Sequence, residues 1–108
     1  MADLKKNPTL KDLQAHIKKL CEEKGWHHDN PETKFLLFVE EVGELAKAMR
    51  IKKGLYGEKA KKRQKSFELE EEFADVLNYL LDLANHYGVD LEKAYRKKNK
   101  INEGRVWE

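Results

Sequence analysis

The sequence predicts an all-α fold of about four helices. Apolar residues recur at steps of three and four along most of the chain, which is the spacing of amphipathic helices, and no segment reads as a strand. Helix-capping residues precede these periodic segments and glycines follow them. At 108 residues the chain has room for one domain, so we expect a single domain over residues 1–108, with a flexible N-terminus over residues 1–8.

The first helix is expected to begin after Thr9, which can cap it, and to end near Gly25. Between them, five apolar residues stand at helical spacing: Leu10, Leu13, Ile17, Leu20 and Cys21. Cys21 is the only cysteine, which excludes an intramolecular disulfide, and its place in the apolar pattern indicates a buried core residue.

The second helix is predicted from Pro31 to about Gly54, with Asp29 or Asn30 as its cap, because proline is tolerated in the first turn of a helix. Its apolar residues alternate steps of three and four, as in helical bundles: Phe35, Phe38, Val42, Leu45 and Met49. Residues 54–65 follow as a predicted basic loop, since they contain two glycines and no apolar period.

Ser66 is expected to cap a third helix that ends at Gly88, and Asp90 to cap a fourth that runs to about Gly104. The third helix carries a bundle-type stripe: Leu69, Phe73, Val76, Leu80, Leu83 and Tyr87. A second side is also apolar: Leu77, Leu81 and Ala84. We interpret this wide apolar surface as a subunit interface, with cover by the first and fourth helices as the alternative. The bundle is therefore expected to be completed by homo-oligomerisation into a dimer or tetramer.

Charge is abundant but nearly balanced. Charged residues make up 39% of the chain, yet 22 Lys and Arg face 20 Asp and Glu, so the net charge of +2 gives no strong bias toward nucleic acid or membranes. No apolar run approaches the length needed to cross a bilayer, and the N-terminus lacks a signal-peptide core. We expect a cytoplasmic protein without a membrane partner.

Four acidic residues flank the apolar stripes of the second and third helices. Glu41 and Glu44 lie about 60° apart on one side of the second helix, and Glu72 and Asp75 repeat that spacing on the third. Packing the helices along their stripes would gather these carboxylates, which repel one another unless cations occupy the site. A ligand set of oxygens suits Mg²⁺ or Mn²⁺. The spacing alone leaves a solvated acidic face as an equal alternative.

A di-iron carboxylate bundle is a second alternative for such acids, but it expects histidines three residues after glutamates. None of the four histidines stands at such a position: His16, His27, His28 and His86. The di-iron alternative is therefore largely removed.

The acidic motifs resemble those of a known family. "EEVGE" at residues 40–44 and "EFAD" at residues 72–75 look like the EExxE…ExxD signature of the MazG-like, all-α nucleotide pyrophosphohydrolases. The segment from Asp75 to Arg105 is also similar to the family's sequence after the acidic pair. The resemblance covers about residues 10–105, nearly the whole chain.

The resemblance implies hydrolysis of a nucleoside triphosphate between its α and β phosphates, giving the monophosphate and pyrophosphate. By position, the implied metal ligands are Glu41, Glu44, Glu72 and Asp75, which would hold Mg²⁺, with Mn²⁺ as a possible substitute, and so activate a water molecule for attack on the α-phosphate. Glu40 would act as a water-orienting base or support a metal ligand. The family's final motif is matched by three implied phosphate- or sugar-binding residues: Lys98, Asn102 and Arg105.

Two aromatic residues are implied to bind the substrate. Tyr79, one turn beyond Asp75, and Trp26 match positions at which dCTP-hydrolysing relatives contact the nucleotide and stack on its base. These relatives carry a second aromatic where this chain has Arg50-Ile51-Lys52, a departure that does not favour a cytosine-specific cage.

The basic cluster "KAKKRQK" at residues 59–65 supports a different class of function, nucleic-acid binding through phosphate contacts, and a noncatalytic helical interaction module is a further alternative. The cluster has no interleaved aromatic residues, and acidic residues follow it directly at 68–72. Nucleic acid is therefore not the expected partner. The sequence predicts an enzyme that limits or removes particular nucleoside triphosphates.

Overall fold

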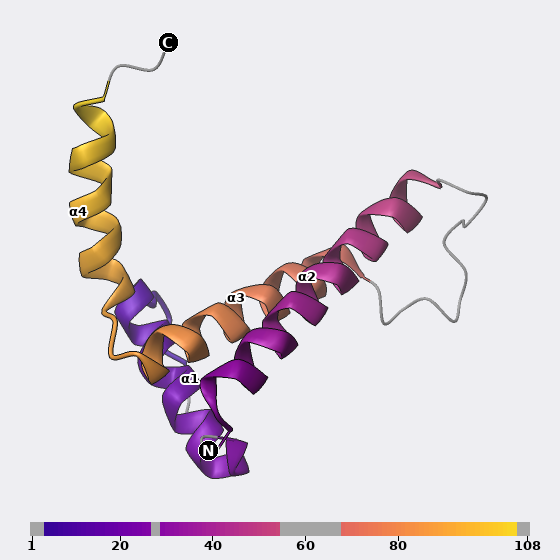
Figure 1. Cartoon of the computed structure of the whole chain (residues 1–108), viewed down its shortest axis with the longest axis horizontal. Coiled ribbons are helices and arrows are strands. Elements are labelled where there is room, and N and C mark those ends of the chain that lie inside the picture. Colours follow the sequence, from indigo (N-terminus) through magenta and orange to yellow (C-terminus); the bar gives the residue numbers. More distant parts are fainter. Residues whose placement is uncertain (1–3, 27–28, 55–67, 106–108) are drawn as a thin grey trace. The chain divides into compact units, whose positions relative to one another are not determined.

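The structure is a computed structural model that describes residues 4–26, 29–54 and 68–105 (Figure 1). Its regular elements in these ranges are four helices: α1 (Leu10–Lys24), α2 (Pro31–Lys53), α3 (Leu69–His86) and α4 (Leu91–Glu103). The predicted all-α class and the helix order are confirmed for this part of the chain. Ser66 and all of the predicted basic loop except Gly54 lie outside the described residues.

Side-chain caps fix the starts of three helices, because a helix leaves its first backbone N–H groups without partners inside the helix. At each start a side-chain oxygen accepts a hydrogen bond from the N–H three residues later: Thr9 from Asp12 at 3.1 Å, Asn30 from Thr33 at 2.7 Å, and Asp90 from Lys93 at 3.1 Å. Asp12 Oδ2 also accepts from the Thr9 N–H at 3.0 Å, which completes a capping box. The predicted caps of these three helices are confirmed, with Asn30 rather than Asp29 at α2.

Three glycines, at the ends of α1, α2 and α3, adopt the left-handed backbone conformation that other residues rarely take. Gly25 ends α1 with φ of +76°, and Gly88 follows α3 with φ of +67°. In the second case the Val89 N–H donates to the Ala84 carbonyl at 2.9 Å, which turns the chain from α3 toward α4. The predicted ends of these helices are confirmed.

The chain divides into two compact units. The first contains α1, α4 and the end of α3 from Leu81 onward; the second contains α2 and α3 as far as Leu80. The core of the first unit consists of Ile17, Cys21 and Leu81, and four partly buried leucines pack against it: Leu10, Leu13, Leu20 and Leu91. The predicted burial of Cys21 is confirmed.

The prediction that Leu81 and Ala84 belong to a subunit interface is wrong. Leu81 is 0% exposed and packs with Ile17 and Cys21 of α1, and Ala84 is also buried. Helix α1 therefore covers Leu81 within the chain, which is the alternative that the sequence left open. Leu77, by contrast, remains exposed.

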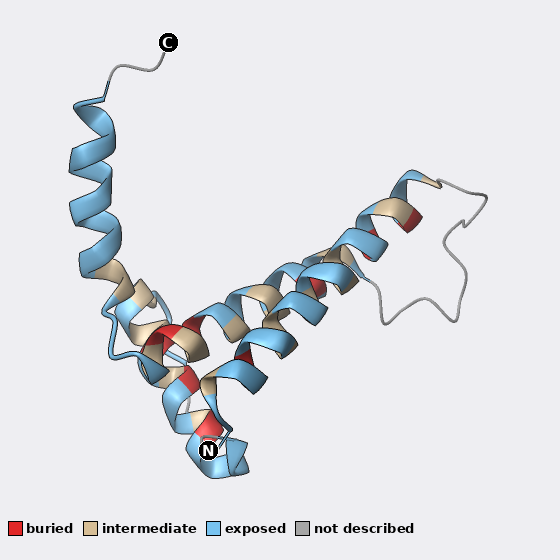
Figure 2. Ribbon diagram, in the orientation of Figure 1, coloured by how far each residue is buried: buried red, intermediate tan, exposed pale blue. Residues whose placement is uncertain are grey.

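In the second unit, the predicted apolar stripe of α2 is only partly covered. Phe38 and Leu45 are half-buried, whereas three other members of the predicted stripe are exposed: Phe35, Val42 and Met49 (Figure 2). Val39 extends this exposed stripe. The expectation that α2 and α3 pack along this stripe is wrong, because the side of α2 that meets α3 carries Glu41. None of the four described helices combines the length and the hydropathy required to span a bilayer.

Candidate functional site

Three acidic side chains meet in the second unit, Glu41 from α2 and Glu72 and Asp75 from α3. Each offers one carboxylate oxygen, and the three oxygens lie within 4.8 Å of one another. All three were predicted as metal ligands from their spacing and from the family resemblance. Oxygens this close can share one cation, because Mg²⁺ and Ca²⁺ bind oxygen ligands at about 2.0–2.6 Å.

Local sequence explains how the two helices present these acids. Glu72 lies in the first turn of α3 with Glu70 and Glu71, where negative side chains interact favourably with the positive end of the helix dipole. The Glu72 N–H donates to the Glu68 carbonyl at 3.1 Å, which closes that first turn. Asp75 follows three residues later and so shares a side of the helix with Glu72.

Glu41 holds its proton more tightly than an ordinary glutamate. Its pKa is raised above 4.5, first because burial disfavours the charged carboxylate and then because of repulsion by Asp75, Glu72, Glu44 and Glu40, in that order. The charges of both helices therefore act on one side chain. This is the electrostatic environment that a bound divalent cation would relieve.

Glu72 is the most buried acid of the group, with 5% of its surface exposed. Its pKa is also raised above 4.5, first by burial and then by the charges of Asp75, Glu44 and Glu71. Its Oε2 atom is buried and has no hydrogen-bond partner among the described residues. A buried carboxylate oxygen without a donor is costly, so the site fits a cation that would bind this atom.

Glu44 and Glu40 lie at the edge of this group. Glu44 is half-buried and stands outside the three residues that share the 4.8 Å spacing, yet its charge raises the pKa of both Glu41 and Glu72. Glu40 is exposed, directly before Glu41 on α2. The metal-binding role of Glu44 and the water-orienting role of Glu40 remain predictions.

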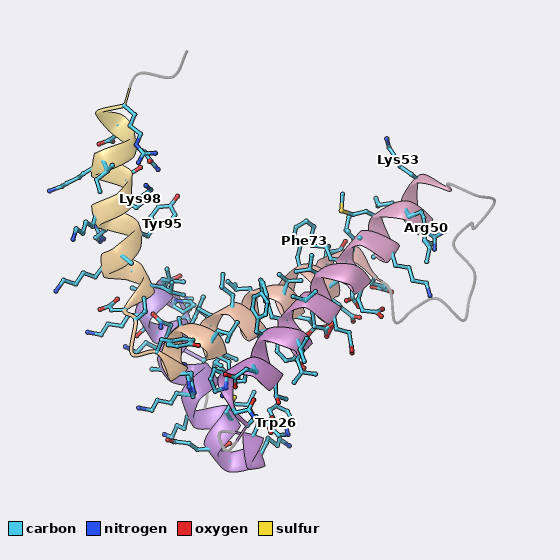
Figure 3. All side chains as sticks on the ribbon, viewed as in Figure 1. Trp26, Arg50, Lys53, Phe73, Tyr95 and Lys98 are labelled. Carbon is cyan, nitrogen blue, oxygen red and sulfur yellow. The ribbon has the colours of Figure 1, made fainter. Side chains whose placement is uncertain are left out.

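The two aromatic residues predicted to bind substrate lie in different units. Tyr79 is half-buried on α3, one turn after Asp75, in the same unit as the acids. Trp26 directly follows Gly25 at the end of α1 in the first unit, and 53% of its surface is exposed (Figure 3). An indole that is half exposed leaves a ring face available for stacking.

The predicted phosphate ligands all belong to the first unit. Lys98 is exposed on α4 (Figure 3). Asn102 is exposed on the same helix, and Arg105 is exposed just beyond its end. The Arg105 N–H donates to the Asn102 carbonyl at 3.1 Å, which holds the chain close to the helix at this point. Their binding to phosphate remains a prediction.

Sequence reasoning missed a polar pair in the first unit, the buried Gln14 and the half-buried Asn85. Gln14 is 6% exposed, and its side chain is hydrogen-bonded to Asn85, Val89 and Leu91. The signal was present, because Gln14 stands at a position of the apolar pattern of α1, four residues after Leu10 and three before Ile17. A polar residue at a core position requires a specific partner.

The sequence is similar to those of several known proteins. The chain is 36% identical over 96 residues to YvdC of Bacillus subtilis, a match that covers 82% of this chain and 91% of that protein. It is also 36% identical over 100 residues to human dCTP pyrophosphatase 1, covering 91% of this chain but only 59% of the human enzyme.

A solved structure and a family match extend the likeness to the fold. The crystal structure of YPJD from Bacillus subtilis superposes with a TM-score of 0.74 at 31% identity, and covers 94% of this chain and all of that one. Residues 29–105 match the MazG nucleotide pyrophosphohydrolase domain, and this range contains all four predicted metal ligands. The chain therefore belongs to the MazG nucleotide pyrophosphohydrolase family.

Proposed function

We propose that this protein is a Mg²⁺-dependent nucleoside triphosphate pyrophosphohydrolase, which converts a (d)NTP to the monophosphate and pyrophosphate and so serves nucleotide-pool housekeeping. The proposal rests on the grouping of three carboxylates. In a chain of this family, Glu41, Glu72 and Asp75 bring oxygens within 4.8 Å of one another, and a buried Glu72 oxygen has no partner among the described residues.

The acids divide into metal ligands and a base. Glu41, Glu44, Glu72 and Asp75 would hold Mg²⁺, with Mn²⁺ as a substitute. When bound, the cation supplies positive charge to phosphate oxygens and lowers the pKa of water. Glu40 orients the attacking water and accepts its proton. The water oxygen joins the α-phosphorus, the bond from the α-phosphorus to the bridging oxygen breaks, and pyrophosphate leaves.

The remaining predicted residues bind the substrate. Lys98 and Arg105 contribute positive charge to the phosphates, and Asn102 donates a hydrogen bond to phosphate or sugar. Trp26 stacks on the base and Tyr79 contacts the nucleotide. The first substrate to test is dCTP, because a relative with 36% identity is a dCTP pyrophosphatase.

We also propose that the active protein is a homo-oligomer, a dimer or a tetramer. The support is a pair of apolar stripes that remain exposed in the second unit, defined on α2 by Phe35, Val39, Val42 and Met49 and on α3 by Phe73, Leu77 and Leu80. Both stripes advance by three, four or seven residues, the spacing that packs helices into bundles. Large contiguous apolar surfaces are uncommon on monomers, and a second copy of the same two helices would cover them.

The test is a panel of purified nucleoside triphosphates with Mg²⁺, Mn²⁺ or EDTA, in which the monophosphate, pyrophosphate and orthophosphate are quantified. We expect Mg²⁺-dependent release of pyrophosphate and monophosphate in equal amounts. Orthophosphate as the first product would contradict the assignment. Absence of any hydrolysis would favour the alternative, a noncatalytic helical interaction module or a nucleic-acid-binding protein, and salt-dependent binding to random duplex DNA would select the latter.

A further inference from the structure

A partly buried hydrogen-bond network joins α1 to the start of α4. Gln14 Nε2 donates to Asn85 Oδ1 at 3.2 Å and to the Val89 carbonyl at 2.8 Å, while Gln14 Oε1 accepts from the Leu91 N–H at 2.8 Å. In return, Asn85 Nδ2 donates to the Gln14 main-chain carbonyl at 2.9 Å. Both hydrogens of the Gln14 amide are used, so the network is specific to this side chain.

The network reaches three successive points of the chain, the end of α3, the turn that follows it and the first residue of α4. The Leu91 N–H is one of the N–H groups that a helix start leaves without a partner inside the helix, and here Gln14 satisfies it from another helix. The Leu91 side chain also packs against the core of Ile17, Cys21 and Leu81. The start of α4 is thus held by the side-chain amide of Gln14 and by the packing of Leu91 against this core.

Beyond its start, α4 is exposed, and no described residue supports it in a comparable way. None of its residues is buried, and residues 93–105 are all exposed (Figure 2). The direction of the helix is therefore set where it begins. Asn102 lies about 16 Å along the axis from Leu91, so a tilt of about 10° at the base would displace it by about 3 Å. A hydrogen bond to phosphate does not survive a displacement of that size.

We propose that Gln14 and Asn85 are positioning residues, which aim α4 so that Lys98, Asn102 and Arg105 reach the phosphates of the substrate. This inference rests on the proposed function, because it assumes that these three residues bind phosphate. Neither Gln14 nor Asn85 contacts the substrate. Replacing either residue should therefore weaken the binding of the triphosphate. It should leave cation binding unchanged, because the proposed cation ligands all belong to the second unit.

The first variant is Gln14→Glu, which keeps the shape of the side chain and an acceptor for the Leu91 N–H. It replaces the donating amide by an oxygen that faces two acceptors, Asn85 Oδ1 and the Val89 carbonyl. The second is Asn85→Asp, which removes only the donor to the Gln14 carbonyl. We expect KM for the triphosphate, and the inhibition constant of inorganic pyrophosphate, to rise roughly tenfold or more in both, with a smaller change in kcat. The Mg²⁺-induced rise in melting temperature should equal that of the unchanged protein.

Leu20→Ala is the matched control, because Leu20 packs against the same core but makes none of these hydrogen bonds. It should lower the melting temperature without raising KM. Hydrogen exchange of the free protein gives an independent reading: the backbone amides of residues 89–94 should exchange faster in the two polar variants, while those of α2 stay unchanged.

Two failures can be told apart. If the unchanged protein hydrolyses no triphosphate, the proposed function is lost and this inference is lost with it. If the unchanged protein is active and KM stays within twofold in both polar variants, or rises equally in Leu20→Ala, the proposed function stands and the positioning role is wrong. If one of the two polar variants does not fold, the other still tests the proposal, because the two variants remove different hydrogen bonds of the network.

Discussion

At the scale of single residues, Glu72 is the most buried acid of the site. Its side chain is almost fully buried and one oxygen has no partner in the described part of the chain. Burial, and then the charges of Asp75, Glu44 and Glu71, raise its pKa. A folded protein can keep such a carboxylate only if other interactions offset its cost. A bound divalent cation would attract all of these carboxylates and so offset their mutual repulsion.

Replacing Glu72 by Gln should therefore have opposite effects on activity and on stability. Turnover should fall by orders of magnitude, because a ligand of the cation is lost. Without divalent cations the melting temperature should rise by a few degrees, because a buried charge beside Asp75 is removed, and Mg²⁺ should no longer raise it. Scanning calorimetry with EDTA and with Mg²⁺ measures both effects.

Glu70→Gln is the control for this variant, since Glu70 is exposed on the same helix and the same charge is removed. It should leave turnover and the response to Mg²⁺ unchanged. If Glu70→Gln and Glu72→Gln behaved alike, the acids would form a solvated face and no cation site.

The raised pKa values of Glu41 and Glu72 predict how the stability depends on pH. A carboxyl whose pKa is raised in the folded state binds its proton more tightly there than in the unfolded chain. Its contribution to the free energy of unfolding is thus fully present below 4.5, the ordinary value, and is lost as the pH rises through the raised pKa. Mg²⁺ should restore stability at neutral pH, and protons should displace it as the pH falls.

Melting temperatures measured with and without Mg²⁺ between about pH 5 and 7.5 test this sign. The gain from Mg²⁺ should shrink toward the acidic end. Sodium chloride at matched ionic strength should give little gain at any pH, because screening by monovalent ions does not replace a bound cation. A gain from Mg²⁺ that grew toward the acidic end, or an equal gain from both salts, would contradict the cation site.

At the scale of helices, the sequence was sufficient for the boundaries and insufficient for the packing. The caps Thr9, Asn30 and Asp90 act on N–H groups three residues away, so their effect is local and readable from the sequence. Which side of a helix is covered depends on distant partners. Leu81 and Leu77 both belong to an apolar pattern, but only Leu81 meets α1.

The grouping of the acids can likewise be read from local spacing, whereas the hydrogen-bond network at the start of α4 depends on residues far apart in the sequence. Glu41 and Glu44, like Glu72 and Asp75, are spaced so that each pair shares a helix side, and the sequence reveals this directly. Gln14 and Asn85 are 71 positions apart, and only the folded chain joins them. A polar residue in an apolar pattern indicates that a partner exists, but it does not identify the partner.

The burial of Leu81 predicts a large loss of stability in Leu81→Ala, about 2–5 kcal/mol in the free energy of unfolding, because the variant leaves a cavity between α1 and the end of α3. Leu77→Ala should cost clearly less in the dissociated chain, because Leu77 is exposed there. Urea denaturation at low protein concentration measures both values. Equal losses would mean that α1 does not cover Leu81.

The exposed stripes of α2 and α3 predict the assembly. Val39→Glu combined with Leu77→Glu places charges on both stripes and should lower the oligomer size measured by light scattering, since apolar area there is otherwise removed from water at roughly 25 cal/mol per Å². Thr33→Glu adds one negative charge at an exposed position of α2 away from the stripe and is the matched control for Val39→Glu alone, which adds the same charge on the stripe. Unchanged size in the double variant, or a monomeric starting protein, would contradict the proposed oligomer.

At the scale of the whole molecule, the predicted functional residues are divided between the two units of the chain. The second unit carries the acids, and the first carries Trp26 and the predicted phosphate ligands of α4. The family match from residue 29 to 105 includes the acids and α4 and leaves out α1. Helix α1 nevertheless supplies both the cover for Leu81 and the amide that fixes the start of α4.

The central claim is that water attacks the α-phosphorus of a nucleoside triphosphate at this site. Hydrolysis of dCTP, or of the best substrate found, in water enriched in ¹⁸O tests it most directly, because the label marks the phosphorus that was attacked. We predict ¹⁸O in the monophosphate and unlabelled pyrophosphate. Label in pyrophosphate would place the attack on the β-phosphorus, and labelled orthophosphate would place it on the γ-phosphorus; either result would contradict the account.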